Sequence, residues 1–210
     1  MATVLGAKGC GKSFLVDFIV SKEEKSASRL MSKNGRPLVN MPTYEIRGNG
    51  GERVLLLDAH EELSAEALLW CYFLSSVFVL NLPHDDSKAQ ERFLQQLRAL
   101  KESVESEPED LSLPQLILVR RDAPSKQFGD KDLVRQIEEC GLFQSDIATL
   151  GMVSPGGEKV HRRDIVDVSE ELLNPLFVND ALSLSYMIKS SRGKTIRGNP
   201  MGSKIAALAL

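Results

Sequence analysis

Residues 6 to 13 read Gly6-Ala7-Lys8-Gly9-Cys10-Gly11-Lys12-Ser13, a complete G-x-x-x-x-G-K-S motif. An apolar run, residues 2 to 5, precedes the motif, and a helical pattern that begins Phe14-Leu15-Val16 follows it. A strand, a glycine-rich loop and a helix in this order are the setting in which the motif binds nucleotide phosphates. The glycines let backbone N–H groups converge on a phosphate, and the helix adds its positive N-terminal end. These residues are therefore the candidate nucleotide-binding loop, with a flexible loop that exposes a lysine as the alternative.

Two side chains of the motif have specific expected roles. Lys12 would reach the β- and γ-phosphates of a nucleotide, and Ser13 would ligate Mg²⁺. A second metal-side group should lie at the end of another strand, and the apolar run 54–57 ends in Asp58. Asp58 is the candidate to hold Mg²⁺, directly or through water. The alternative is an aspartate that only caps a turn after the strand.

Apolar runs recur along the chain in alternation with helical patterns. After the first, they cover residues 54–57, 77–80 and 116–119, and polar or glycine-rich residues follow each of them. This alternation predicts an α/β fold with a largely parallel central sheet and helices on both faces. Ligands bind beyond the carboxyl ends of the strands in such folds, so the residues that follow each run are site candidates.

Several helices are also predicted. One begins with a capping box of Ser87 and Gln90, and its apolar residues recur at helical spacing up to residue 100. A second covers residues 130–140 and ends at Gly141 in the usual C-cap position. Others cover residues 175–188 and 199–210, while the acidic stretch 102–110 is predicted to be an exposed loop.

Composition excludes several classes of protein. With 210 residues, 42% of them hydrophobic, the chain can bury a sizeable core, which excludes a disordered or fibrous protein. A net charge of −3 provides no overall polycation for nucleic acid or anionic lipid, although the segment after Met187 is basic and has no acid. The three cysteines lack close CxxC pairs, which argues against a zinc site and favours reduced thiols.

No transmembrane segment or secretory signal is expected. The uncharged stretch 67–82 is shorter than the ~20 residues of a spanning helix, and Ser75 and Ser76 divide it into a helix end and a buried strand. The start of the chain has no basic region before an apolar one. A cytoplasmic location is therefore expected, and the apolar end of the chain suggests a fragment or short form of a longer protein.

The chain resembles the GTPase domain of the guanylate-binding proteins, which are dynamin-like GTPases related to the atlastins. The resemblance covers nearly the whole chain, so residues 1–210 are expected to form one GTPase-like domain of the N-terminal type, in divergent or truncated form. It rests on matching motifs at residues 11–15, 55–58, 75–81, 121–122, 160–163 and 174–178. The Arg121-Asp122 pair is the most specific, because this family has it where other GTPases have Asn-Lys-x-Asp.

The resemblance implies a ligand and a partner. Asp122 would accept hydrogen bonds from the N1–H and the exocyclic amine of guanine, and residues 156–163 would cap the base. GTP and Mg²⁺ are therefore the expected cofactors, and two GTPase domains would pair across their nucleotide faces. An ordinary surface pair of Arg121 and Asp122 is the alternative, as are solvated side chains at Arg162 and Arg163.

The chain also departs from the family at three catalytic positions. The family has Asp-x-x-Gly where this chain reads Asp58-Ala59-His60-Glu61, and its internal arginine finger falls at Gly9, beside Lys8. The switch threonine has no clear counterpart, since Arg36 lies near the expected place and Thr43 is the only threonine of that segment. A transition-state arginine supplies ~10³ to 10⁵ in rate, so these losses affect hydrolysis more than binding.

Two functions are therefore expected to compete. The first is a GTPase that hydrolyses GTP slowly, with Lys8 and His60 as candidate catalytic groups and an ordinary surface histidine as the alternative at His60. The second is a non-catalytic interaction module that keeps the fold. An ATP-using P-loop kinase is a third class, but the chain lacks an arginine-rich lid segment. Cys10, at a helix N-terminus, is expected to have a lowered thiol pKa.

Overall fold

The computed structural model describes residues 1–7, 9–22, 43–59, 63–104, 113–122, 131–156 and 173–191. A six-stranded sheet with the strand order β2-β3-β1-β4-β5-β6 forms its centre. Every neighbouring pair of strands is parallel except β2 and β3. The strands are β1 Ala2–Gly6, β2 Thr43–Arg47, β3 Arg53–Asp58, β4 Val77–Pro83, β5 Gln115–Arg121 and β6 Ala148–Met152.

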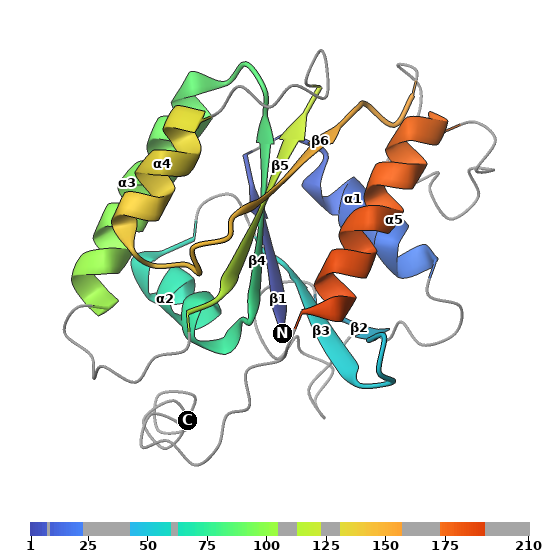
Figure 1. Ribbon diagram of the computed structural model, residues 1–210, viewed down its shortest axis with the longest axis horizontal. Helices are drawn as coiled ribbons and strands as arrows, with labels where there is room; N and C mark the ends of the chain where they lie inside the picture. The colour runs from blue at the N-terminus through green and yellow to red at the C-terminus, as the bar shows by residue number, and fades with distance from the viewer. Residues whose placement is uncertain are drawn as a thin grey trace.

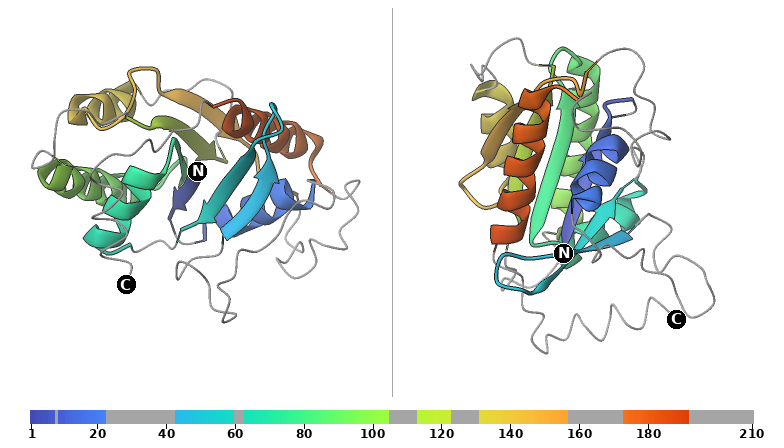
Figure 2. Two further views of the ribbon diagram at one scale, coloured as in Figure 1. Left: turned by 90° about the horizontal axis from the view of Figure 1, so that it is seen from below. Right: turned by 90° about the vertical axis from the view of Figure 1, so that its right-hand side faces the viewer.

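Helices cover both faces of this sheet (Figure 1). On one face lie α1 Lys12–Ser21 and α5 Pro175–Ser190, which pack against each other. On the other lie α2 Ala65–Leu74, α3 Ser87–Val104 and α4 Lys131–Cys140, and the two views in Figure 2 show the same layers. The expected α/β fold, with a largely parallel sheet and helices on both faces, is confirmed. The P-loop GTPase type remains a prediction from the sequence.

The central strands are apolar along their length because both of their faces are buried. Val77 and Val79 of β4 pack toward α1 and α5, whereas Phe78 and Leu80 pack toward α2 and α3. On the α1 side, the ring of Phe177 from α5 meets the ring of Phe14 at 5.6 Å and the ring of Phe18 at 5.4 Å. This contact fixes α1, and with it the loop before α1, against the sheet.

The position of β1 creates the place for a ligand. Its neighbours are β3 on one side and β4 on the other. The connection that leaves β1 leads to β2 and β3, whereas the connection that leaves β4 leads to β5 on the opposite side. Open α/β sheets bind ligands at the carboxyl ends of strands whose connections lead in opposite directions. The glycine-rich motif follows β1 at this edge.

The predicted helices need one correction. The backbone N–H of Ala89 donates to Oδ1 of Asp86 over 2.9 Å, so Asp86 caps α3 and Ser87 is already its first residue. The expected capping box of Ser87 and Gln90 is therefore wrong by one residue. The same helix continues to Val104, so the start of the acidic stretch 102–110 is helical, and residues 105–110 lie outside the described residues.

Other predicted elements agree with the structure. Gly141 ends α4 with a φ of 68°, as a C-cap glycine does, and α5 covers the helix expected from residue 175. The stretch 67–82 divides into α2 and β4, and no helix among the described residues is long and apolar enough to cross a membrane. The helix predicted for residues 199–210 lies outside the described residues.

Replacing Phe177 with alanine tests the packing that supports α1. Phe177 is fully buried between α5 and α1, so Phe177→Ala should lower the free energy of unfolding by about 3–5 kcal/mol. Its neighbour Leu176 is 53% exposed, and Leu176→Ala should change stability by less than about 1 kcal/mol. Urea denaturation followed by circular dichroism measures both, and equal losses would contradict this packing.

Candidate nucleotide-binding site

The glycine-rich loop connects β1 to α1. Gly9 and Gly11 have φ values of 76° and 72°, which side chains other than glycine adopt only with strain. Gly11 occupies the N-cap position of α1, and no side chain caps the helix there. The first N–H groups of α1 thus have no side-chain cap, and a helix N-terminus of this kind favours an anion.

Lys12 and Asp58 lie together at the edge of the sheet. Asp58 ends β3, next to Val4 of β1, and its Oδ1 forms an ion pair with Nζ of Lys12. The two side chains are only 10% and 3% exposed. Each charge therefore depends on the other for compensation, and a triphosphate with its metal ion could take over both partners. The structure thus brings together the two residues that the sequence predicted for this role.

Ser13 and Asp58 provide the oxygen groups that a magnesium ion requires. Ser13 is the second residue of α1 and is partly exposed, and Asp58 lies at the end of β3. No group of three or more His, Cys, Asp or Glu side chains suited to a metal exists among the described residues. Magnesium at phosphate sites takes one or two carboxylates together with phosphate oxygens and water, so this donor set fits Mg²⁺ bound with a nucleotide.

Arg121 is buried beneath the loop. Its side chain is 4% exposed, its Nη1 donates to Sδ of Met152 over 3.0 Å, and its guanidinium lies 5.4 Å from the ring centre of Phe177. A Cβ atom on Gly11 would lie 3.0 Å from Nη2 of Arg121, so the guanidinium touches the loop. Burial lowers the pKa of Arg121, and the neighbouring Asp122 opposes this shift. A pair of two ordinary surface residues is therefore excluded.

Asp122 points the other way, toward solvent. It has a φ of 60°, and among the described residues it is the one non-glycine residue in the left-handed region. Its N–H donates to the carbonyl of Met152 over 2.8 Å, and its carboxylate accepts a hydrogen bond from the hydroxyl of Ser154. Such backbone conformations persist where surrounding contacts hold them, often at functional sites. The carboxylate is thus presented at the same edge of the sheet as the loop.

Cys10 differs from the prediction. The thiol was expected to have a lowered pKa because it lies near a helix N-terminus. Burial instead raises its pKa and outweighs the opposing effects of the Lys12 backbone N–H and of the charges of Arg121 and Lys12. Cys10 is 7% exposed, so its environment is that of a small core residue within the loop.

Some predicted site residues cannot be placed. Lys8, His60, Glu61 and the pair Arg162 and Arg163 lie outside the described residues, as does Arg36. Gly6 is the last residue of β1, and Ala7 follows it at the start of the loop. Thr43, the threonine considered for a switch role, is buried in β2 opposite Leu57.

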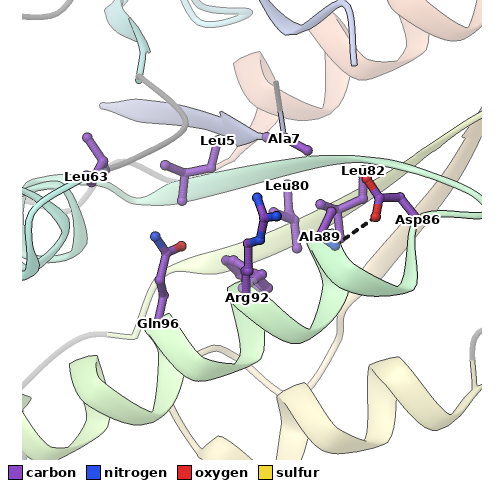
Figure 3. Close-up of a pocket in the computed structure, with 11 residues that line it drawn as sticks. Leu5, Ala7, Leu63, Leu80, Leu82, Asp86, Ala89, Arg92 and Gln96 are labelled. Atoms are coloured by element: carbon purple, nitrogen blue, oxygen red, sulfur yellow. Dashed lines mark hydrogen bonds between the residues drawn. The ribbon is translucent and has the colours of Figure 1, made fainter. Parts of the chain in front are cut away.

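A cleft of about 340 Å³ lies on the α3 side of the sheet, and its lining includes Gly6 and Ala7, the first two residues of the motif (Figure 3). The other lining residues come from β1, β4, α3 with its cap, and the residue before the α2 cap. Four leucines line it, together with Arg92 and Gln96 of α3. Lys12, Asp58 and Asp122 are not among its lining residues.

The sequence analysis missed Asn81 as a site residue. This side chain is fully buried within β4, and its Nδ2 donates to the backbone carbonyl of Cys10 over 3.3 Å. The available signal was a single amide side chain in an otherwise apolar run, directly opposite the first glycine of the motif.

Comparisons with known proteins give matches of overall structure only. No protein-family model and no curated protein matches the chain. A GTP-binding protein from the hyperthermophilic archaeon Sulfolobus solfataricus, solved in complex with GDP, matches 89% of this chain with a TM-score of 0.44 and 11% identity. A mutation variant of SsGBP matches 90% with a TM-score of 0.43 and 11% identity. This chain spans 52% and 57% of the lengths of those two chains.

Breaking the ion pair of Lys12 and Asp58 should destabilise the free protein. Lys12→Met leaves the carboxylate of Asp58 buried without compensation, which should cost about 3–5 kcal/mol of unfolding free energy. The double variant Lys12→Met with Asp58→Leu should lose less than the single one. The measurement is urea denaturation without nucleotide or Mg²⁺.

An ion pair between β3 and β2 provides the control for this prediction. Nε of Arg53 lies 3.4 Å from Oε1 of Glu45, and the arginine side chain is 81% exposed, so Arg53→Met should cost at most about 1 kcal/mol. Equal losses in Lys12→Met and Arg53→Met would show that the buried pair has no special structural role.

Proposed function

We propose that this chain binds a guanine nucleotide together with Mg²⁺ and hydrolyses GTP slowly, if at all. The observation that carries the proposal is the placement of Lys12 and Asp58 at the N-terminus of α1, beside the carboxyl ends of β1 and β3. A cation, a carboxylate and a helix N-terminus in one place are the groups that a magnesium triphosphate needs.

Groups of the loop and of neighbouring elements would bind the phosphates together. The backbone N–H groups of the loop and of the first turn of α1 would bind phosphate oxygens, and Lys12 would neutralise the β- and γ-phosphates. Ser13 and Asp58 would hold Mg²⁺, which supplies positive charge to the phosphate oxygens. Hydrolysis would then require a water molecule in line with the bond to the γ-phosphate.

Asp122 is the residue proposed to select guanine. A carboxylate accepts two hydrogen bonds from the N1–H and the 2-amino group of guanine, and adenine does not offer this pair of donors. The structure supports this role, because Asp122 is exposed and extends from the same edge of the sheet as the loop. Arg121 supports the site from below through its contact with Gly11.

Replacing Asp122 with asparagine tests the proposed base site. An amide can donate to the 2-oxo group of xanthine but mismatches the donors of guanine, and such a mismatch costs ~1–3 kcal/mol. Asp122→Asn should therefore weaken GTP binding by about tenfold or more and strengthen binding of xanthosine triphosphate. Competition against a fluorescent nucleotide measures both affinities.

The control for this experiment is Asp146→Asn, which changes an exposed aspartate elsewhere. It should leave the preference for GTP unchanged. If Asp122→Asn behaves like Asp146→Asn, Asp122 does not contact the base.

A nucleotide-binding interaction module without useful hydrolysis is the second candidate function. Gly9 favours it, because this position of the loop has no side chain that could reach the transition state. A Cβ atom built on Gly9 would have nothing within 4 Å, so there is open space where a side chain of residue 9 would begin. Glycine places no charged group in that space. Measuring hydrolysis with and without an excess of partner protein separates the two candidates.

Restoring the missing groups should raise the rate of hydrolysis. Gly9→Arg combined with Glu61→Gly should increase turnover by at least about tenfold, a fraction of the ~10³ to 10⁵ that a well-placed arginine supplies. Gly51→Arg combined with Glu61→Gly is the matched control, because Gly51 also has a positive φ and open space around it. Phosphate release measures the rates, and brisk turnover by the natural chain would instead implicate Lys8, His60 or another group.

A further inference from the structure

We propose that Asn81 is a positioning residue for phosphate binding: its side chain holds the Cys10 carbonyl inward and so keeps the loop in its anion-binding conformation. This inference rests on the proposed function, because it assigns a role at the same nucleotide site. It concerns β4, a strand that the motif itself does not include.

The sheet places Asn81 directly beneath the loop. Asn81 pairs with Gly6, the last residue of β1 and the first of the motif. Its neighbours Leu80 and Leu82 pack on the α3 side, so the alternation of side chains along a strand directs Asn81 to the α1 side. There its Nδ2 lies 3.3 Å from the carbonyl oxygen of Cys10, which is 71 residues away in sequence.

A phosphate-binding loop needs such a donor for a simple reason. Its N–H groups must face outward to the anion, so some of its carbonyl groups turn toward the protein interior. A carbonyl that is buried there requires a hydrogen-bond donor. Asn81 supplies this donor from a strand that is rigidly paired on both sides, with β1 and with β5.

The end of β1, Asn81 and Cys10 are packed as closely as their atoms allow. A Cβ atom on Gly6 would lie 2.4 Å from the Asn81 carbonyl oxygen, 2.9 Å from Sγ of Cys10 and 3.2 Å from Cβ of Asn81. Glycine at position 6 is thus the condition for β1, Cys10 and Asn81 to approach each other. The carboxamide reaches Cys10 because this approach is so close.

The residue type at position 81 is not explained by packing. Asn81 is 0% exposed, and its Oδ1 has no hydrogen-bond partner among the described residues. A buried acceptor without a donor lowers stability, and leucine has a similar size without this defect. An amide that serves only the fold would therefore be a poor choice, whereas one that orients the Cys10 carbonyl is required.

The first test separates nucleotide binding from stability. Asn81→Leu should weaken binding of fluorescent methylanthraniloyl-GTP in Mg²⁺ by about three- to tenfold, the range of one lost hydrogen bond. The thermal unfolding midpoint without nucleotide should change little, because leucine removes the orphan Oδ1 but also leaves the Cys10 carbonyl without its donor. A residue with a purely structural role would lower both quantities or leave both unchanged. Asn179→Leu, at an exposed position of α5, is the control for a leucine substitution.

The second test uses pH to switch the donor on and off. In Asn81→Asp, a protonated carboxyl group can still donate to the Cys10 carbonyl, while an ionised one cannot and also repels the phosphates. Burial disfavours the ionised form, so the change should occur above the usual pKa range of aspartate. The ratio of the dissociation constant of the variant to that of the natural chain should therefore rise at least about tenfold between pH 5 and pH 8. Taking this ratio removes the titration of the nucleotide itself.

The outcomes distinguish this inference from the proposed function. If the natural chain binds methylanthraniloyl-GTP, an affinity of Asn81→Leu within twofold of Asn179→Leu overturns the role of Asn81. A ratio for Asn81→Asp that is constant with pH overturns it as well. If the natural chain binds no nucleotide at any pH, the proposed function fails, and the role of Asn81 fails with it.

Discussion

The ion pair between Lys12 and Asp58 joins the start of α1 to the end of β3, and the geometry of the site depends on it. Both side chains are nearly buried, so neither charge is compensated by water, and each is stable in its place only while the other is present. The ion pair thereby fixes the glycine-rich loop beside β1 and β3. A magnesium triphosphate offers negative charge to Lys12 and positive charge to Asp58. Binding can therefore exchange one set of compensated charges for another.

Two further contacts hold the loop from beneath, and both come from strands distant in sequence. Arg121 of β5 touches Gly11 and lies over the ring of Phe177, which ties the loop to α5. Asn81 of β4 donates to the carbonyl of Cys10. With the ion pair, these contacts connect the loop to three strands of the sheet. The loop is therefore held in place by contacts with the buried sheet and with α5, in addition to its chain connections to β1 and α1.

Sequence reasoning predicted the fold because parallel buried strands leave a direct signal, a continuous apolar run. It also predicted that Asp58 and Lys12 belong to one site, because the carboxyl ends of parallel strands meet at one edge. The cap of α3 was misplaced because Asp86 and Ser87 are both good capping residues and only the backbone geometry distinguishes them. Errors of this kind are local and leave the architecture unchanged.

The burial of individual polar side chains could not be predicted from the sequence. In the sequence, Arg121 is typical of a solvated charge. In the structure it contacts Met152 and Phe177, which come from distant segments. The pKa of Cys10 was predicted in the wrong direction for the same reason, because the helix N-terminus is visible in the sequence and the surrounding side chains are not. The role of Asn81 depends on the register of β4 against β1, which pairs it with Gly6.

Equilibrium dialysis of the natural chain against labelled GTP and ATP, each with Mg²⁺, is the most direct test of the central claim that this loop is a guanine-nucleotide site. The account predicts saturable binding of one GTP per chain, at least about tenfold tighter than binding of ATP, a difference of ~1.4 kcal/mol. Equal affinity for the two nucleotides would contradict the assignment of Asp122 to the base. Absence of saturable binding of either nucleotide would contradict the phosphate site itself.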